Sequence, residues 1–275
     1  MDRLHFTKME GTGNDFIVVD GLERETDSVV RQAKFLCDRR FGIGADQLLL
    51  ILPSQKADFR MGIINADGSE VEMCGNGVRC FAKYLIDHGL FSGDTVAVET
   101  PAGIIKPSLR KGAVAVDMGK PILDGPRIPV KMDGQIISKP LSVDGHTWKM
   151  TCVSMGNPHC VIPVDGLDDF PVERVGRQIE TDPLFPNRTN VEFIEIVNKG
   201  EIGMRVWERG AGETLSCGTG ACASAVAAAL NGWTGRSVVV HLKGGDLNIA
   251  WLDDDRIIMT GPAREVFTGE IELPD

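Results

Sequence analysis

Short apolar runs separated by polar and turn residues recur along the chain, a pattern typical of a strand-rich α/β protein. These runs predict strands at residues 16–20, 47–52, 59–65, 95–99 and 113–118, and again at 202–207 and 237–242. A weaker helical pattern covers residues 27–38. The chain therefore reads as mostly strands interrupted by a few helices.

A stronger helix is expected directly after Cys74, where apolar residues return at the spacing of one helical face. Gly89 then supplies the glycine that commonly follows a helix C-terminus. Residues 221–230 are small and apolar on every face, which predicts a second helix surrounded by protein. The residues of the first apolar face are Val78, Phe81, Ala82, Leu85 and Ile86.

The two helical segments belong to a repeat with one ungapped offset. The sequence Cys-Gly-Asn-Gly at 74–77 returns as Cys-Gly-Thr-Gly at 217–220, 143 residues later. The same offset aligns further pairs between residues 13 and 109, including Gly13-Asn14 with Gly156-Asn157. The pattern indicates a tandem duplication of one α/β unit.

The duplication predicts an α/β (α+β) fold of two pseudo-symmetric domains. We expect a mostly antiparallel β-sheet or barrel wrapped around a central helix in each, with an active-site cleft between the domains. The expected boundaries are 1–117 and 118–262. Residues 263–275 alternate in polarity and are expected to add a strand that completes the N-terminal domain.

Composition and charge exclude several classes of binding partner. The 275 residues carry a formal net charge of −10 and no Lys/Arg-rich run, so nucleic acid and anionic membranes are not expected partners. No apolar stretch approaches the ~20 residues that span a bilayer, and the N-terminal residues lack the apolar core of a signal peptide. We therefore expect a cytoplasmic protein whose seven cysteines are free thiols.

Each duplicated loop combines a thiol with a predicted helix start. Backbone N–H groups at a helix N-terminus are unpaired and favour an anion, and glycine lets a ligand approach closely. Asn76 and Thr219 add polar side chains to the two loops. A cysteine at such a position can have its pKa lowered from about 8.5 toward neutrality, which makes it usable as a base.

A single Cys-Gly pair is more often a small buried filler than a functional group. Two copies change that balance, since facing units would place Cys74 and Cys217 on opposite sides of one bound carboxylate. One thiolate could then remove an α-proton while the other thiol protonates the opposite face. The two helix N-termini would stabilise the enediolate-like transition state.

Metal and redox uses of the cysteines are disfavoured by their spacing. The chain contains neither the paired Cys-x-x-Cys of a structural zinc site nor a thioredoxin-like motif, so no metal is expected. The other five cysteines are interpreted as structural: Cys37, Cys80, Cys152, Cys160 and Cys222.

Other polar residues at repeat-equivalent positions could complete a pocket. Asn14 and Asn157 each follow a glycine and could equally be turn residues. Asn65 aligns with Glu208-Arg209, a change of chemistry that suits a substrate with two different ends, although a solvated ion pair is an equal alternative. His159, considered alone, is more often a satisfied loop histidine than a catalytic one.

These motifs closely resemble the diaminopimelate epimerase family. The resemblance rests on residues 73–80, 156–159 and 216–223, and it runs from residues 8–16 to residues 260–263. Proline racemase and the phenazine-biosynthesis isomerase are similar in fold but do not share Cys-Gly-Asn-Gly-x-Arg-Cys.

The resemblance implies a cofactor-independent interconversion of LL- and meso-diaminopimelate, in bacterial lysine and peptidoglycan-precursor biosynthesis. It implies that Cys74 and Cys217 are the acid and base, that His159 and Glu208 tune the thiols, and that Asn65, Asn190, Glu208 and Arg209 hold the distal L-centre. The implied substrate-binding residues are Asn14, Gln47, Asn65, Gly75, Asn76, Asn157, Asn190, Glu208, Arg209, Gly218 and Thr219.

The family resemblance also implies a homodimer. Phe267 stands where a tyrosine associated with dimer contacts is expected, a departure that does not touch the chemistry. Two other functions remain open from the residues alone. One is a racemase or isomerase acting on another carboxylate such as proline, and the other is a non-catalytic amino-acid-binding protein.

Overall fold

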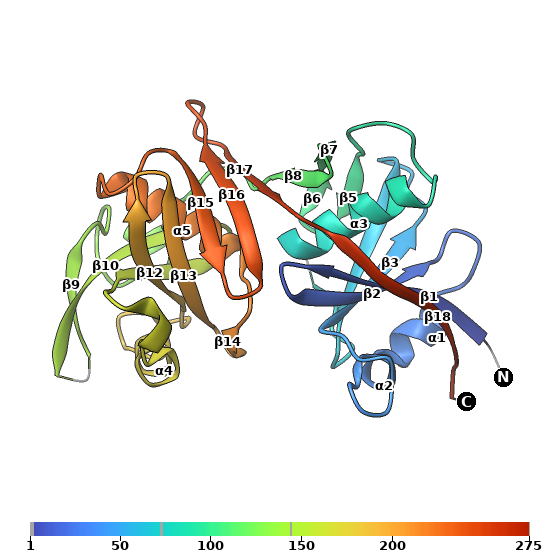
Figure 1. Ribbon diagram of the computed structural model, residues 1–275. Coiled ribbons are helices and arrows are strands. Elements are labelled where there is room, and N and C mark those ends of the chain that lie inside the picture. Colours follow the sequence, from blue (N-terminus) through green and yellow to red (C-terminus); the bar gives the residue numbers. More distant parts are fainter. Residues whose placement is uncertain (1–2, 72–73, 144, 275) are drawn as a thin grey trace. The chain divides into compact units, whose positions relative to one another are not determined.

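The computed structural model describes residues 3–71, 74–143 and 145–274, and the chain divides into two units. The first comprises Met1–Val116 and Gly261–Asp275, and the second comprises Asp117–Thr260. Met73, which belongs to the first cysteine motif, lies outside the described residues. Figure 1 shows both units, with labels on most of their helices and strands.

The first unit is a mixed sheet with one long helix against it. Its strand order is β18 (Arg264–Glu272), β1 (Arg3–Gly11), β2 (Asn14–Asp20), β3 (Gln47–Leu52), β4 (Phe59–Asn65), β5 (Val98–Thr100) and β6 (Gly103–Ile105). The hairpin of β7 (Ser108–Arg110) and β8 (Ala113–Asp117) comes next along the chain and is not part of this sheet. Helix α3 (Gly75–Asp87) contacts β1, β2, β3, β7 and β18. The helix that starts after Cys74 thus covers the first four strands in the order of the sheet, from β18 to β3.

Most expected elements of this unit are confirmed, and two differ. Strands at 47–52 and 59–65 have the expected bounds, whereas the strand expected at 95–99 begins only at Val98. The helix expected over 27–38 is two short helices, α1 (Asp27–Arg31) and α2 (Ala33–Cys37). They are separated at Gln32, whose ψ of 10° departs from helical geometry.

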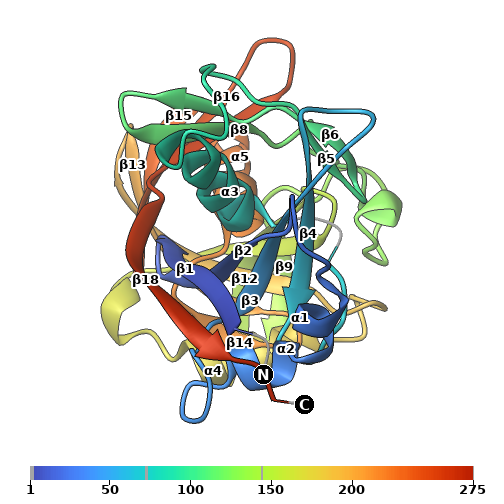
Figure 2. The same ribbon diagram turned by 90° about the vertical axis from the view of Figure 1, so that its right-hand side faces the viewer.

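The C-terminal strand returns to the first unit. β18 pairs antiparallel with β1 from Arg3↔Glu272 to Glu10↔Arg264, with a register shift between Lys8 and Met9. Figure 2 shows β18 lying beside β1. Val266 and Phe267 on β18 are exposed. The sequence's first and last strands are therefore neighbours in one sheet.

The second unit repeats this arrangement. In the order of the sheet its strands are β17 (Ile257–Gly261), β16 (Gly245–Trp251), β15 (Ser237–Leu242), β13 (Glu201–Glu208), β12 (Asn190–Asn198), β11 (Pro158–Pro163), β10 (His146–Ser154) and β9 (Lys139–Val143). β14 (Gly212–Thr214) pairs with β13. The helices are η1 (Gly125–Arg127), η2 (Leu167–Asp169), α4 (Val172–Glu180) and α5 (Gly218–Leu230).

Corresponding elements of the units confirm the duplicated fold. α3 and α5 have the same length and begin 143 residues apart, and β1 and β10 correspond in the same way. The neighbours β1–β2–β3–β4 run antiparallel, parallel, antiparallel, as do β10–β11–β12–β13. In the described residues neither sheet closes into a barrel, so of the two expected forms the open sheet is the one observed.

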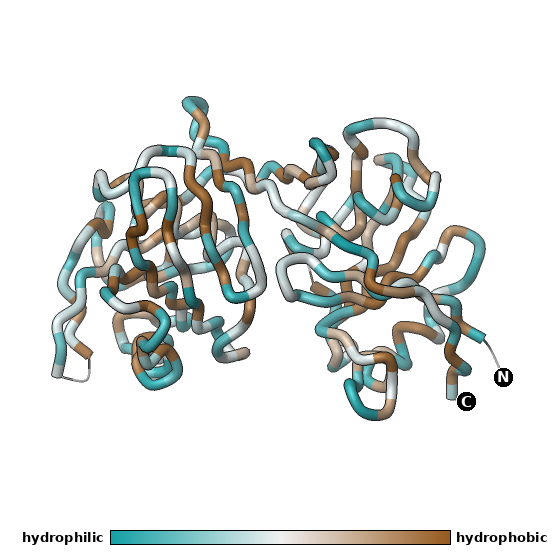
Figure 3. The backbone as a smooth tube through the Cα atoms, in the orientation of Figure 1, coloured by the Kyte–Doolittle hydropathy of each residue, from teal (hydrophilic) through white to brown (hydrophobic). Residues whose placement is uncertain are grey.

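Burial of apolar side chains explains how each helix is held. α5 contacts β10, β11, β12, β13, β15 and β16, and its residues from Gly220 to Ala228 are buried, as expected from its apolar sequence. Figure 3 shows apolar segments along the inner strands of each unit and hydrophilic ones in many connecting loops. None of the helices in the described ranges is both long and apolar enough to cross a membrane.

Candidate active site

Cys74 is the N-cap residue of α3. Its backbone is extended (φ −138°, ψ 114°), and its Sγ accepts a hydrogen bond of 3.4 Å from the Gly77 N–H. A side chain that caps a helix satisfies one of the four N–H groups left free at the start. The thiol is half-buried, and Gly75 and Asn76 behind it are buried. The sequence therefore places a partly accessible sulfur at the positive end of a helix.

A network of side chains fixes the surroundings of Cys74. Asn14 Oδ1 lies 3.6 Å from Cys74 Sγ and accepts a 3.4 Å bond from Asn76 Nδ2. The Asn14 amide donates to Asp46 Oδ2 at 2.7 Å. Because a carboxylate can only accept, this bond orients the Asn14 carbonyl toward the thiol. Asn14 is thus part of the thiol site and not only a turn residue.

Arg79 stabilises the loop that carries Cys74 and Asn76. It is fully buried, and its guanidinium donates to Asn76 Oδ1 at 2.9 Å, to Thr12 Oγ1 at 3.1 Å and to the Pro262 carbonyl at 3.1 Å. A buried guanidinium is stable only when such acceptors surround it. Arg79 therefore ties helix α3 to the β1–β2 turn and to the segment before β18.

Gln47 and Asn65 form a second polar pair in the first unit. They are directly opposite in the β3–β4 ladder, and Gln47 Nε2 donates to Asn65 Oδ1 at 2.9 Å. Asn65 Nδ2 donates to Ser69 Oγ at 3.0 Å, whereas the buried Gln47 Oε1 has no hydrogen-bond partner. An unpaired buried acceptor is costly, so Gln47 offers an atom that a ligand's N–H could satisfy.

Cys217 repeats the geometry of Cys74. It is the N-cap of α5 (φ −128°, ψ 111°), and its Sγ accepts from the Gly220 N–H at 3.4 Å. Its Sγ also lies 3.5 Å from Thr219 Oγ1. Unlike Cys74, Cys217 is buried, with 6% of its surface exposed.

The expectation that a helix start lowers the thiol pKa is wrong for Cys217. Burial raises its pKa well above 9.0, and the nearby carboxyl groups of Glu208 and Glu192 raise it further. Hydrogen bonds from Thr219 and the Gly220 N–H oppose this effect without overcoming it. Desolvation and two carboxylates outweigh the helix terminus and favour the thiol form of Cys217.

His159 lies behind Cys217 in a chain of hydrogen bonds. Its Nδ1 is 2.7 Å from Glu192 Oε1 and its Nε2 is 2.9 Å from Asn157 Oδ1. Asn157 Nδ2 then donates to Thr219 Oγ1 at 3.3 Å. Both His159 and Glu192 are fully buried. The structure thus brings His159, Asn157 and Thr219 together with Cys217.

Glu208 and Arg209 lie at the end of β13. Glu208 accepts from Thr214 Oγ1 at 2.5 Å, and burial together with the charge of Glu192 raises its pKa above 4.5. Asn190 donates to the Pro158 carbonyl and accepts from the Arg209 N–H, both at 2.9 Å. Asn190 is therefore engaged on both sides and fixes the backbone that carries the exposed Arg209.

Three residues of these networks were missed by the sequence analysis as site residues: Arg79, Asp46 and Glu192. Glu192 carried a usable signal, because it is a charged residue in an apolar strand and the repeat aligns it with Leu49. Arg79 lies in the Cys-Gly-Asn-Gly-x-Arg-Cys motif, yet nothing in the sequence distinguishes a buried arginine from an exposed one. Asp46 lies in a loop and gave no signal.

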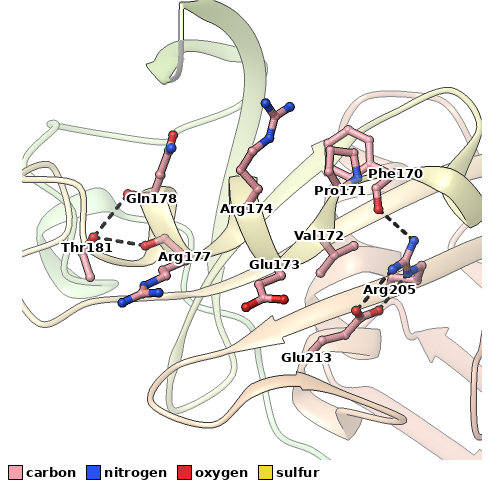
Figure 4. A pocket seen from close by; sticks show the side chains of 10 residues that line it. All are labelled: Phe170, Pro171, Val172, Glu173, Arg174, Arg177, Gln178, Thr181, Arg205 and Glu213. Atoms are coloured by element: carbon pink, nitrogen blue, oxygen red, sulfur yellow. Dashed lines mark hydrogen bonds and ion pairs between the residues drawn. The ribbon is translucent and has the colours of Figure 1, made fainter.

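A pocket of about 840 Å³ beside α4 is separate from these residues (Figure 4). Arg205 in its wall pairs with Glu213 at 2.8 Å and donates to the Leu167, Asp168 and Phe170 carbonyls. These bonds satisfy the guanidinium and anchor η2 to β13. Across the described part of the chain, no three His, Cys, Asp or Glu side chains cluster as metal ligands would.

Similar folds occur among solved isomerases and related proteins. A phenazine biosynthesis protein of the PhzF family from Bacillus anthracis superposes with a TM-score of 0.73, at 18% identity and coverage of 99% of this chain and 100% of that one. A hydroxyproline epimerase from Agrobacterium vitis gives 0.69, at 15% identity, 99% and 93% coverage. At these identities the likeness defines the fold alone.

Sequence similarity defines the family. The family model described as diaminopimelate epimerase matches residues 6–123 and 151–266. Proteins named diaminopimelate epimerase from Moorella thermoacetica and Methanococcus maripaludis are 54% and 47% identical, each covering 98% of this chain and 100% of the relative. The chain belongs to the diaminopimelate epimerase family.

Proposed function

We propose that the protein is an isomerase that interconverts LL- and meso-2,6-diaminopimelate without a cofactor, using Cys74 and Cys217 as its two bases. The observation that carries the proposal is the shared geometry of the two cysteines. Each cysteine is a helix N-cap. Its sulfur accepts a 3.4 Å hydrogen bond from the backbone N–H of the glycine three residues later. Family membership and identities near 50% to proteins named for this activity support the substrate.

The proposed reaction inverts one α-carbon. One cysteine as thiolate takes the α-proton, which leaves the bond electrons delocalised into the α-carboxylate as an enediolate-like anion. The other cysteine, as thiol, then donates its proton to the opposite face and becomes the thiolate. The N–H groups at the starts of α3 and α5 would stabilise the extra negative charge on the carboxylate oxygens.

Binding residues are assigned on the same basis. Asn14, Asn76, Asn157 and Thr219 would surround the reacting centre, together with Gly75 and Gly218, whose missing side chains leave the backbone accessible. Asn65, Asn190, Glu208 and Arg209 would hold the distal L-centre of the substrate, and Gln47, which is hydrogen-bonded to Asn65, would line the site. Arg209 can grip a carboxylate and Glu208 can pair with an ammonium group. His159 and Glu208 would adjust the proton affinity of Cys217.

The assignment is tested by supplying purified, reduced protein with LL-diaminopimelate and separating the stereoisomers by chiral chromatography. We expect the meso isomer to accumulate until the two forms reach equilibrium. A parallel panel containing L-proline and other amino acids defines the substrate. Turnover of proline and none of diaminopimelate would reject the assigned substrate. Binding without turnover of any acid would reject the proposal that the protein is an enzyme.

The proposal includes a cytoplasmic location and a homodimeric state. Size-exclusion chromatography with light scattering tests the dimer.

A further inference from the structure

The polar surroundings of the two thiols differ at positions that the repeat makes equivalent. An added Cβ at Gly77 would meet Leu49 Cδ2 at 3.3 Å and Phe16 Cε1 at 3.4 Å. At the equivalent Gly220 it would meet Glu192 Oε1 at 2.7 Å. The repeat aligns Leu49 with Glu192 and Phe16 with His159. One helix start thus rests on an apolar pair and the other on a buried carboxyl–imidazole pair.

The hydrogen bonds behind Cys217 have defined directions. Asn157 uses its amide N–H toward Thr219, so its carbonyl oxygen accepts from His159 Nε2–H. With Nε2 protonated, one further proton is shared between His159 Nδ1 and Glu192 Oε1 across 2.7 Å. Thr219 Oγ1 accepts from Asn157, and its own hydroxyl proton remains available for Cys217 Sγ at 3.5 Å. The chain can therefore donate a hydrogen bond to the sulfur when it is a thiolate.

We propose that Glu192 is a positioning residue for Cys217: by holding His159 Nδ1 it keeps Nε2–H on Asn157 and thereby directs the Thr219 hydroxyl toward the sulfur. The inference rests on the proposed two-thiol function and deepens it. Hydrogen bonds connect Glu192 to the sulfur by way of His159, Asn157 and Thr219. Its charge also raises the Cys217 pKa directly, so the test needs two variants that share the loss of charge and differ in the hydrogen bond to His159.

The orientation of His159 depends on this partner because a neutral imidazole has one donor and one acceptor nitrogen. If Glu192 is absent, the ring can adopt the tautomer with Nδ1–H. Nε2 then becomes an acceptor, Asn157 turns its N–H toward it, and the Asn157 carbonyl takes the Thr219 hydroxyl proton. The thiolate of Cys217 would lose its side-chain donor.

Other ionisable groups near Cys217 must be separated from this effect. Glu208 on β13 and Glu192 on β12 both raise the Cys217 pKa, and His159 on β11 contacts Glu192 and lowers the pKa of Glu208 by its charge. Removing the charge of Glu192 alone therefore lowers the Cys217 pKa. Loss of the hydrogen-bond chain raises it, so the two effects have opposite signs and can be told apart.

The experiment compares Glu192→Gln with Glu192→Leu. Both variants remove the charge, but only Gln keeps a side chain that can hydrogen-bond His159 Nδ1, and Leu is the residue that the equivalent position already accommodates at Leu49. The rate of alkylation of Cys217 by iodoacetamide is followed as a function of pH by peptide mass spectrometry. Cys74 in the same molecules is the internal control.

We expect the Cys217 titration midpoint to lie about one pH unit higher in Glu192→Leu than in Glu192→Gln, with Cys74 unchanged between the two. We expect kcat/KM for diaminopimelate to be roughly 10- to 100-fold lower in Glu192→Leu than in Glu192→Gln. Equal Cys217 midpoints in the two variants, or parallel shifts of Cys74, would overturn the positioning role.

The double variant His159→Phe/Glu192→Leu controls for misfolding. It places at these two positions the Phe–Leu pair that the first unit already packs at Phe16 and Leu49. Its Cys217 midpoint should match that of Glu192→Leu, since both lack the chain and the charge, and a midpoint equal to that of Glu192→Gln contradicts the inference. If Glu192→Leu and Glu192→Gln differ at Cys217 as expected but the wild-type protein does not epimerise diaminopimelate, the proposed function fails and the role of Glu192 stands.

Discussion

His159 and Glu192 form a fully buried pair joined by a 2.7 Å contact between Nδ1 and Oε1, at positions where the first unit carries Phe16 and Leu49. Duplication supplied two similar helix starts, and substitution at these two positions made them chemically different. The surroundings of Cys74 contain the Asn14 amide oriented by Asp46, whereas those of Cys217 contain carboxyl groups and an imidazole. Different surroundings suit the proposed reaction, in which one cysteine must begin as a thiolate and the other as a thiol.

The close approach of Glu192 to α5 predicts unequal effects of one substitution in the two repeats. Gly220→Ala forces the buried Glu192 carboxyl group away, since the new Cβ would lie 2.7 Å from Oε1. Gly77→Ala meets side-chain carbons at 3.3–3.4 Å, a tight contact that small shifts relieve. We expect Gly220→Ala to lower the free energy of unfolding by about 1–3 kcal/mol and kcat/KM by at least tenfold, and Gly77→Ala to have smaller effects.

Urea unfolding and steady-state kinetics on both variants check this prediction. Equal losses in the two variants would mean that the packing at the helix start, and not the carboxyl group, decides tolerance at this position.

The raised pKa of Glu208 predicts how kcat/KM changes with pH on the acid side of its profile. Burial raises the pKa of its carboxyl group above 4.5, and the charge of Glu192 raises it further. If the proposed reaction needs the Glu208 carboxylate, kcat/KM falls as the pH drops through this raised value, before free carboxyl groups are protonated. Glu208→Gln should lower kcat/KM and remove this limb. An acid limb that persists unchanged in Glu208→Gln belongs to another group.

Asp15 predicts how the first unit responds to acid. Burial alone would raise the pKa of its carboxyl group, but Arg39, with bonds of 2.9 and 2.7 Å, and Lys8 at 2.7 Å lower it well below 3.8. The folded state thus binds the Asp15 proton less readily than the unfolded chain. Its stabilisation is complete above the unfolded pKa of 3.8 and is lost as the pH falls below that value.

Asp15→Asn should lower the free energy of unfolding by about 3 kcal/mol at pH 7, because it leaves the buried Lys8 ammonium without its carboxylate. The difference from wild type should shrink at pH 3. Denaturant unfolding at the two pH values measures both quantities. A difference that stays constant between pH 7 and pH 3 would show that the ion pair is not the source.

The buried hydrogen bonds of Arg79 predict that replacing it by another positively charged residue lowers the stability of the fold. Lysine keeps the charge but cannot donate simultaneously to Asn76, Thr12 and Pro262 with the geometry of a guanidinium. We expect Arg79→Lys to lower the free energy of unfolding by about 2–3 kcal/mol, roughly the loss of one or two hydrogen bonds to a charged group. Thermal unfolding by calorimetry provides the measurement, and a wild-type melting temperature would contradict the buried role.

Much of the fold follows from sequence, because the 143-residue repeat fixes which segments correspond. The helices after Cys74 and Cys217 were predictable from apolar spacing and from the loops before them. The late start of β5 was not, because Thr95 instead makes an isolated bridge to Ser108. The break at Gln32 was not predictable either, since residues 27–38 continue a helical pattern across it.

The thiol sites were predictable in residue identity but not in electrostatics. Cys74, Asn14 and Asn76 were expected together, as were Cys217, Asn157 and Thr219, and each set lies within one unit. The raised pKa of Cys217 depends on how deeply the sulfur is buried and on two glutamates that the chain brings from β12 and β13. Burial and the approach of charges from distant strands are properties of the packed fold.

The central claim, that Cys74 and Cys217 are the two bases, is tested most directly by proton NMR of LL-diaminopimelate in D2O. Wild-type protein and the single variants Cys74→Ala and Cys217→Ala are compared under reducing conditions, following α-deuterium incorporation and the meso isomer. The account predicts meso product carrying α-deuterium with wild type, and a rate of epimerisation reduced about 10²- to 10⁴-fold in each variant. Epimerisation at the wild-type rate in either variant would contradict it.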